Sequence, residues 1–412
     1  MSYNPHPLFA GIDEQSAIHA QVETYLAQAV AFDCRQEYQH AVSFLLSYSA
    51  SPETFKSYRR EVERLLQWCW FEAHILLRDM DREVFEAYLA FAFSPPGDWV
   101  ASKSAPRFIF CDGAWRANAH WRPYLQRASK VEKQLGVEQS SNYNMRSGAR
   151  KALFAGVSTF CTYLLQENYL SRNPVALLRQ KSRFIVREQQ TRITRKLTDL
   201  QWYNVLQVVE KLAKTQPKYE RHVFLLSCFY LLGVRISELA TTPLHTPTMQ
   251  DFSRDEAGRW WFTVIGKGNK RREIAVPDML LAALKRYRLS RQLTPLPLRG
   301  ESSPLLHNYK NAGGLSIRQI RTLIQECFDK AIATLLEQQQ EDAAHDLMAA
   351  TVHWLRHTAI SADVQHRPRD HVRDDAGHES ISTTDRYIDI DRAARHDSAR
   401  YKSIIPEQYK EC

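Results

Sequence analysis

The sequence predicts a mainly α-helical chain in two units, with one small antiparallel sheet in the second unit. Apolar residues recur at helical spacing along most of the 412 residues. One stretch, 259–277, changes to β-prone runs on either side of a turn at Gly266, Gly268 and Asn269, which is typical of a β-hairpin. Apolar residues make up 44% of the chain, enough for real cores, which argues against a disordered protein.

The first half of the chain reads as a series of amphipathic helices. Residues 1–44 are acidic and are predicted to form an N-terminal helical extension, and a helical domain is predicted over 45–177. Ser51 stands where a helix N-cap is expected, with Pro52 at the first helical position. The predicted helices of this half span 16–32, 51–73, 79–93 and 147–170.

A non-periodic stretch at about 94–125 interrupts these helices and reads as a long loop or an insertion. It interleaves tryptophan and arginine, at Trp115, Arg116, Trp121 and Arg122. These side chains either face DNA or pack as hydrophobic residues with their guanidinium neighbours exposed, and the sequence leaves both interpretations open.

Positive charge is concentrated between the two halves. The whole chain carries a formal net charge of +9, whereas 178–196 alone holds seven Lys or Arg residues and one Glu. This stretch lacks an apolar period, so residues 178–195 are predicted to form a basic interdomain linker that suits a polyanion. The linker bases singled out as DNA contacts are Lys181, Arg183, Arg187, Arg192 and Arg195.

The second unit, 196–412, is predicted to be helical around the hairpin. Thr198 is the expected cap of its first helix, and the apolar run at 223–234 is too short to span a bilayer, which suits a buried helix. The seven cysteines are scattered and never form a CxxC pair, which indicates reduced thiols in a cytosolic protein. The expected helices span 196–212, 278–292, 316–337, 343–362 and a short segment carrying Tyr387.

Three segments carry residues suited to phosphate chemistry, and each alone has a plainer explanation. Arg235 follows the buried helix and could simply pair with Glu238, three residues on. The hairpin tip carries four bases, which are either solvated or suited to a DNA groove: Lys267, Lys270, Arg271 and Arg272.

His353 and Arg356 are three residues apart and share one helical face, with His357 four residues after His353. A zinc pair is the rival interpretation, but the usual glutamate beside the first histidine is replaced by Trp354 and no third ligand is evident. We therefore expect neither a metal nor any other cofactor.

Taken together, these residues suit the cleavage of a phosphodiester. Two guanidinium groups can hold its non-bridging oxygens, histidines can move a proton, and a lysine on a hairpin tip can protonate the leaving oxygen. The nucleophile this set requires is a tyrosine whose phenolate the surrounding cations stabilise. Tyr387, nine residues after His378, is the candidate, although a lone tyrosine there could also be an ordinary half-buried residue.

The ordered motifs GVRISEL, GKGNKR, HWLRHT and GHESISTTDRY resemble those of the tyrosine recombinase (phage integrase) family, which includes Xer, Cre and lambda-integrase proteins. The resemblance covers about residues 45–400. It implies a core-binding domain and a catalytic domain that clamp duplex DNA. Ala376 departs from the pattern, because a leucine is common before the Gly-His pair. The residues that the resemblance assigns to catalysis are Arg235, Lys267, His353, Arg356, His378 and Tyr387, supported by Glu238.

The resemblance further implies site-specific strand exchange through a 3′-phosphotyrosine, without metal or ATP. Integration or excision of a mobile element and resolution of cointegrates or multimers are all open. The expected partners are double-stranded DNA and three further copies of the chain in a homotetramer, with a second recombinase or a directionality factor as an option. No membrane association is expected, and the expected location is cytoplasmic and nucleoid-associated. The alternatives are a catalytically silent DNA-binding accessory protein on the same fold and a type IB topoisomerase-like relaxing activity.

Overall fold

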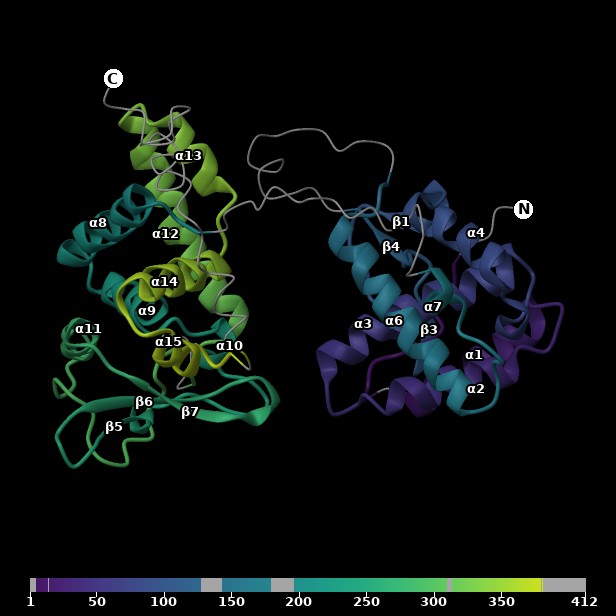
Figure 1. Cartoon of the computed structure of the whole chain (residues 1–412), viewed down its shortest axis with the longest axis horizontal. Helices are drawn as coiled ribbons and strands as arrows, with labels where there is room; N and C mark the ends of the chain where they lie inside the picture. The colour runs from purple at the N-terminus through teal and green to yellow at the C-terminus, as the bar shows by residue number, and fades with distance from the viewer. Residues whose placement is uncertain are drawn as a thin grey trace, which may run out of the picture. The chain divides into compact units, whose positions relative to one another are not determined.

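The computed structural model describes residues 5–13, 15–126, 143–178, 196–309, 313–378 and 380. The chain divides into two compact units, Met1–Gln190 and Thr191–Cys412 (Figure 1). Among the described helices, none is both long enough and apolar enough to cross a bilayer.

The first unit is built mainly from helices, as the periodicity predicts. Asp81 caps α4 by accepting a hydrogen bond from the Val84 amide, whereas Ser51 occupies the cap position of α3 without making the side-chain bond. The sequence did not reveal α2. The helices are α1 (Gln15–Ala29), α2 (Arg35–Leu46), α3 (Pro52–Gln67, continued by a π turn at Trp68–Glu72), α4 (Arg82–Phe93), α6 (Ser147–Gln166) and α7 (Pro174–Leu178).

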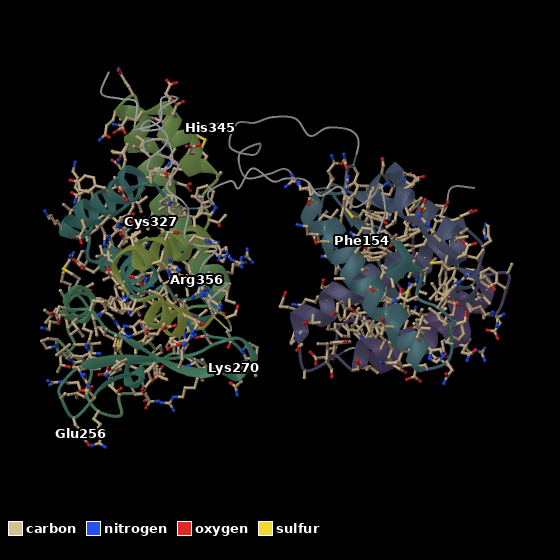
Figure 2. All side chains as sticks on the ribbon, in the orientation of Figure 1. Phe154, Glu256, Lys270, Cys327, His345 and Arg356 are labelled. Atoms are coloured by element: carbon tan, nitrogen blue, oxygen red, sulfur yellow. The ribbon has the colours of Figure 1, made fainter. Side chains whose placement is uncertain are left out.

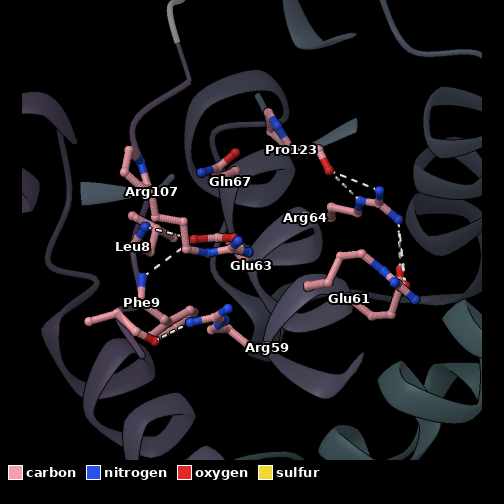
Figure 3. Close-up of polar contacts among 12 residues, drawn as sticks. Leu8, Phe9, Arg59, Glu61, Glu63, Arg64, Gln67, Arg107 and Pro123 are labelled. Atoms are coloured by element: carbon pink, nitrogen blue, oxygen red, sulfur yellow. Dashed lines mark hydrogen bonds and ion pairs between the residues drawn. The ribbon is translucent and has the colours of Figure 1, made fainter. Parts of the chain in front are cut away.

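A buried carboxylate on α3 holds the N-terminal segment (Figure 3). The Glu63 carboxylate is almost fully buried and accepts hydrogen bonds from the Leu8 amide at 2.8 Å and from Arg107. Arg59 donates to the Ala10 carbonyl in the same network. Leu8 and Phe9 are buried in the core of this unit, so the acidic N-terminal region contributes directly to that core.

The stretch at about 94–125, expected to be a long loop or an insertion, contains short strands. Strand β1 (Val100–Ala101) pairs with β4 (Tyr124–Leu125), and β2 (Phe108–Cys111) pairs with β3 (Ala114–Ala117). Trp121 is buried, and the Arg107 guanidinium lies over its ring at 5.0 Å. Trp121 is therefore packed inside the unit, as one of the two interpretations predicted, although the guanidinium beside it is itself mostly buried.

The second unit combines helices with a three-stranded antiparallel sheet. The strands are β5 (Phe252–Arg254), β6 (Trp260–Ile265) and β7 (Arg271–Ala275), and β6 and β7 form the predicted hairpin. Thr198 caps α8 as expected: its side chain accepts from the Gln201 amide, and the Gln201 side chain accepts from the Thr198 amide. The helices are α8 (Asp199–Thr215), α9 (Glu220–Leu232), α10 (Ile236–Leu239), α11 (Asp278–Leu289), α12 (Ile317–Glu337), α13 (Glu341–Met348), α14 (Val352–His366) and α15 (Arg369–Ala376).

Two helices of this unit differ from the sequence prediction. The helix expected over 343–362 is broken into α13 and α14, because the backbone at Thr351 is extended and restarts the helix there. Helix α15 was not predicted. It packs against α14 and β7 (Figure 1), with Val372 and Ala376 buried beside Ile360. The short helix expected at Tyr387 lies outside the described residues.

Candidate active site

Of the residues predicted to take part in catalysis or support it, five have described side chains: Arg235, Glu238, His353, Arg356 and His378. Hydrogen bonds and an ion pair, several of them to main-chain carbonyls, connect Arg235, Glu238, Arg356 and His378 into one cluster. For Lys267 only the backbone is described, at the hairpin tip. Tyr387 and the five linker bases lie outside the described residues.

The turn after the buried helix α9 places Arg235. Gly233 ends that helix with a left-handed backbone, φ 57°, which glycine adopts without strain, and α10 begins directly after Arg235. Arg235 then pairs with Glu238 across 3.0 Å, as its plainer explanation supposed. A third of the Arg235 side chain is nevertheless exposed, so a phosphate can still reach it.

Glu238 is a buried carboxylate saturated with donors. It accepts bonds from the Arg235 backbone amide at 2.7 Å and from the Arg235 side chain. Arg272, from strand β7, binds both carboxylate oxygens, at 2.8 and 2.9 Å. Burial alone would raise the pKa of Glu238, but these bonds outweigh it, so that its pKa lies below the ordinary value and the side chain stays ionised.

Arg356 lies inside the unit on α14, with 3% of its surface exposed (Figure 2). It donates to the Gly233 carbonyl and, at 2.7 Å, to the Ala376 carbonyl. The same guanidinium lies 3.3 Å from Nε2 of His378. Arg356 thus ties the end of α9 to the end of α15.

Three arginines converge on the C-terminal end of α15. The carbonyls of Asp375, Ala376 and Gly377 accept from Arg272, Arg356 and Arg235 in turn, at 2.8, 2.7 and 3.2 Å. The last carbonyls of a helix have no partner within the helix and form the negative end of its dipole. They therefore attract cations, and here they fix three guanidinium groups around one point.

His378 follows this helix end directly and is held neutral. Burial, Arg356 and Arg235 are the leading causes that lower its pKa to about 4. At neutral pH the imidazole is thus uncharged and can exchange hydrogen bonds with Arg356 or with a ligand.

His353 is exposed on α14, one turn from His357. The two rings meet edge to face with centroids 4.4 Å apart. Among the described residues, no group of three or more His, Cys, Asp or Glu side chains could hold a metal ion.

The hairpin bases separate into two kinds. Lys270, at the far end of the hairpin (Figure 2), and Arg271 are exposed, as expected of groove contacts. Arg272 differs, because its side chain is only 14% exposed and is bound to Glu238. Strand alternation could have revealed this, since Arg272 shares its face of β7 with the buried Ile274.

The cluster is therefore suited to binding an oxyanion rather than a metal. Arg235 is partly exposed and held by fixed partners, and the neutral His378 and Arg272 of strand β7 belong to the same network. Preorganised donors of this kind stabilise charge that develops on a phosphate.

Residues 197–393 match a family model described as the phage integrase family. The tyrosine recombinase XerC of Neisseria meningitidis serogroup C is 28% identical over 257 residues, covering 61% of this chain and 72% of the relative. The tyrosine recombinase XerD of Staphylococcus saprophyticus is 25% identical over 279 residues, covering 66% of this chain and 80% of the relative.

Solved structures show the same fold. The XerH site-specific recombinase bound to palindromic difH substrate, in a post-cleavage complex, is similar with a TM-score of 0.53 and 13% identity, over 93% of this chain and 87% of that one. The Tn1549 transposon integrase in complex with transposon right end DNA is similar with a TM-score of 0.52 and 13% identity, over 88% and 98%.

Proposed function

This chain belongs, through residues 197–393, to the phage integrase family of tyrosine recombinases, and from this premise we propose that it cuts and rejoins DNA through a 3′-phosphotyrosine at Tyr387. As a member of this family it is a DNA strand transferase that acts in site-specific recombination. The observation that supports the mechanism best is the convergence of Arg235, Arg356 and His378 on the end of α15.

In the proposed cleavage, the phenolate oxygen of Tyr387 attacks phosphorus and forms a new P–O bond. The P–O bond to the 5′ oxygen breaks, and that oxygen takes a proton from Lys267. Arg235 and Arg356 hold the non-bridging oxygens, whose charge grows in the transition state. The phosphate ester is conserved in the phosphotyrosine, so religation is the reverse reaction and needs neither ATP nor a metal.

The two histidines have separate roles in this proposal. His378, neutral beside Arg356, donates a hydrogen bond to a phosphate oxygen. His353 is exposed on the same helix as Arg356 and assists proton transfer from the tyrosine.

DNA contacts outside the cluster are proposed for the exposed hairpin bases Lys270 and Arg271 and for the basic linker, 178–195. We further propose a homotetramer on paired DNA sites, with a second recombinase or a directionality factor as an optional partner. The biological outcome proposed is integration or excision of a mobile element, or resolution of cointegrates or multimers.

A nicked suicide duplex tests the proposal. The duplex carries a site recovered by footprinting the protein on the DNA that flanks its own gene. The protein should become covalently attached to the DNA, and Tyr387→Phe should abolish the adduct without weakening DNA binding. An adduct formed by Tyr387→Phe would remove Tyr387 from its role.

Two controls separate the alternatives. Sequence-independent relaxation of a supercoiled plasmid would indicate a topoisomerase-like activity. Tight, specific binding with no adduct on any nicked site would indicate a silent accessory protein.

A further inference from the structure

Arg272 joins three parts of the site that are distant in sequence. Its two terminal nitrogens bind Glu238, at 2.8 and 2.9 Å, and its Nε donates to the Asp375 carbonyl at 2.8 Å. Strand β7, which carries it, also forms one arm of the hairpin whose tip includes Lys267. All three guanidinium nitrogens therefore have partners inside the protein, a poor arrangement for a residue that contacts DNA.

Two glycines make room for this guanidinium. A Cβ on Gly266 would lie 3.1 Å from one terminal nitrogen of Arg272 and 3.3 Å from Glu238. A Cβ on Gly377 would lie 3.0 Å from the guanidinium carbon. These glycines directly precede Lys267 and His378, so the Arg272 guanidinium packs against the backbone beside each of them.

The charges around Glu238 also indicate that Arg272 holds the site together. Glu238 is buried and receives both Arg272 and Arg235, so its charge aligns the two guanidinium groups. A bidentate arginine fixes a carboxylate in one plane, which a lysine cannot do. Losing Arg272 would leave Glu238 free to draw Arg235 inward, away from a phosphate.

We propose that Arg272 is a positioning residue, which locks Glu238, the end of α15 and the Lys267 hairpin together so that Arg235 and His378 face one phosphate. This inference rests on the proposed function of the same site. It replaces the expectation that Arg272 contacts DNA, as Lys270 and Arg271 are proposed to do.

The test compares Arg272→Gln and Arg272→Lys with Arg271→Gln on the suicide duplex. Cleavage is measured as the rate of adduct formation at saturating DNA, and binding as the Kd under the same salt. We expect Arg272→Gln to slow cleavage about 10²-fold, because small displacements of reacting groups cost that much, with Kd changed less than threefold. Arg272→Lys should also cleave slowly, although its positive charge is kept. Arg271→Gln should instead weaken DNA binding.

Arg259→Gln is the matched control, because Arg259 lies in the turn before β6 and pairs with Asp255 on the surface. Arg259→Gln should leave both the cleavage rate and the Kd for DNA unchanged. Gly266→Ala keeps every charge and has no backbone strain, so its effect in the parent protein tests the idea where Arg272 variants fold poorly, and its effect in Arg272→Gln tests it where they fold. It should slow cleavage in the parent protein and have no further effect in Arg272→Gln.

Equal cleavage rates for Arg272→Gln and the unchanged protein would overturn the proposal. The proposal would also be overturned if Arg272→Gln weakened DNA binding without slowing cleavage, which is the result expected for Arg271→Gln. If the unchanged protein forms no adduct on its site, the proposed function itself fails, and the positioning role falls with it.

Discussion

Replacing Arg356 by alanine should damage both stability and chemistry, whereas replacing Arg235 should damage mainly chemistry. The sequence presents the two arginines as an equivalent pair. The structure separates them, because Arg356 is 3% exposed while a third of the Arg235 side chain is open to solvent.

The magnitude follows from the bonds that each variant removes. Arg356→Ala leaves the Gly233 and Ala376 carbonyls without this donor inside the protein. An unsatisfied buried polar group costs about 1–3 kcal/mol, so the free energy of unfolding should fall by about 2–6 kcal/mol. Arg235→Ala leaves Glu238 paired with Arg272, and we expect a loss of about 1 kcal/mol.

In the proposed mechanism both substitutions remove a contact to the developing oxyanion, so each should slow cleavage by about 10²–10³-fold. Scanning calorimetry of the full chain measures stability, and the suicide duplex measures cleavage. A unit of this size loses roughly 2–4 °C in Tm per kcal/mol. Arg356→Ala should therefore lower the Tm of the second unit by at least about 4 °C, clearly more than Arg235→Ala does.

Equal Tm losses for the two variants would refute this reasoning, since they would mean that the buried bonds of Arg356 contribute no more than the exposed pair. Arg356→Lys provides the control for charge. It keeps the cation but loses the planar fork that reaches two carbonyls, so its Tm should lie between those of the parent protein and Arg356→Ala.

Three further predictions concern other parts of the chain. Replacing Arg183 and Arg187 in the linker by glutamine should weaken binding to all DNA sequences. It should also reduce the slope of log K against log salt by about 0.9 per lost phosphate contact. An unchanged slope would show that these linker residues do not contact the DNA phosphates. His378, whose pKa is about 4 in the free protein, should bind a proton when a phosphate raises that pKa, so DNA binding should tighten as pH falls from neutrality and level off below pH 4. Calorimetry in two buffers of different ionisation enthalpy should detect this uptake, and His378→Gln should remove it. Glu63→Ala should release the N-terminal segment, with a loss of about 1–3 kcal/mol, and hydrogen exchange at the Leu8 and Phe9 amides should rise without any change in the second unit.

Local patterns were sufficient to predict most of the helices and the hairpin. Thr198 caps its helix as expected, and the glycine-rich turn joins β6 to β7. These features depend on neighbours in sequence, such as a capping side chain or a turn with positive φ at Gly268.

Features that depend on distant contacts were missed or misplaced. Helix α15 has only Val372 and Ala376 buried, too few apolar residues to give a helical period. Its support comes instead from α14, from β7 and from the arginines at its end. For the same reason Arg272 looked like one more basic residue of the hairpin, because its partner Glu238 lies 34 residues away.

The use of main-chain carbonyls accounts for a residue that the resemblance did not lead us to expect. Ala376 stands where the resemblance leads us to expect a leucine, yet its contribution to the site is a carbonyl that any residue supplies. Gly377 is different, because its backbone is left-handed, with φ 62°, and a Cβ there would meet Arg272 at 3.0 Å. Substitutions at residue 376 should therefore alter packing under His378 while leaving the arginine contacts in place, whereas Gly377→Ala should displace Arg272 and slow cleavage. Equal cleavage rates for Ala376→Leu and Gly377→Ala would show that the backbone at this helix end does not organise the site.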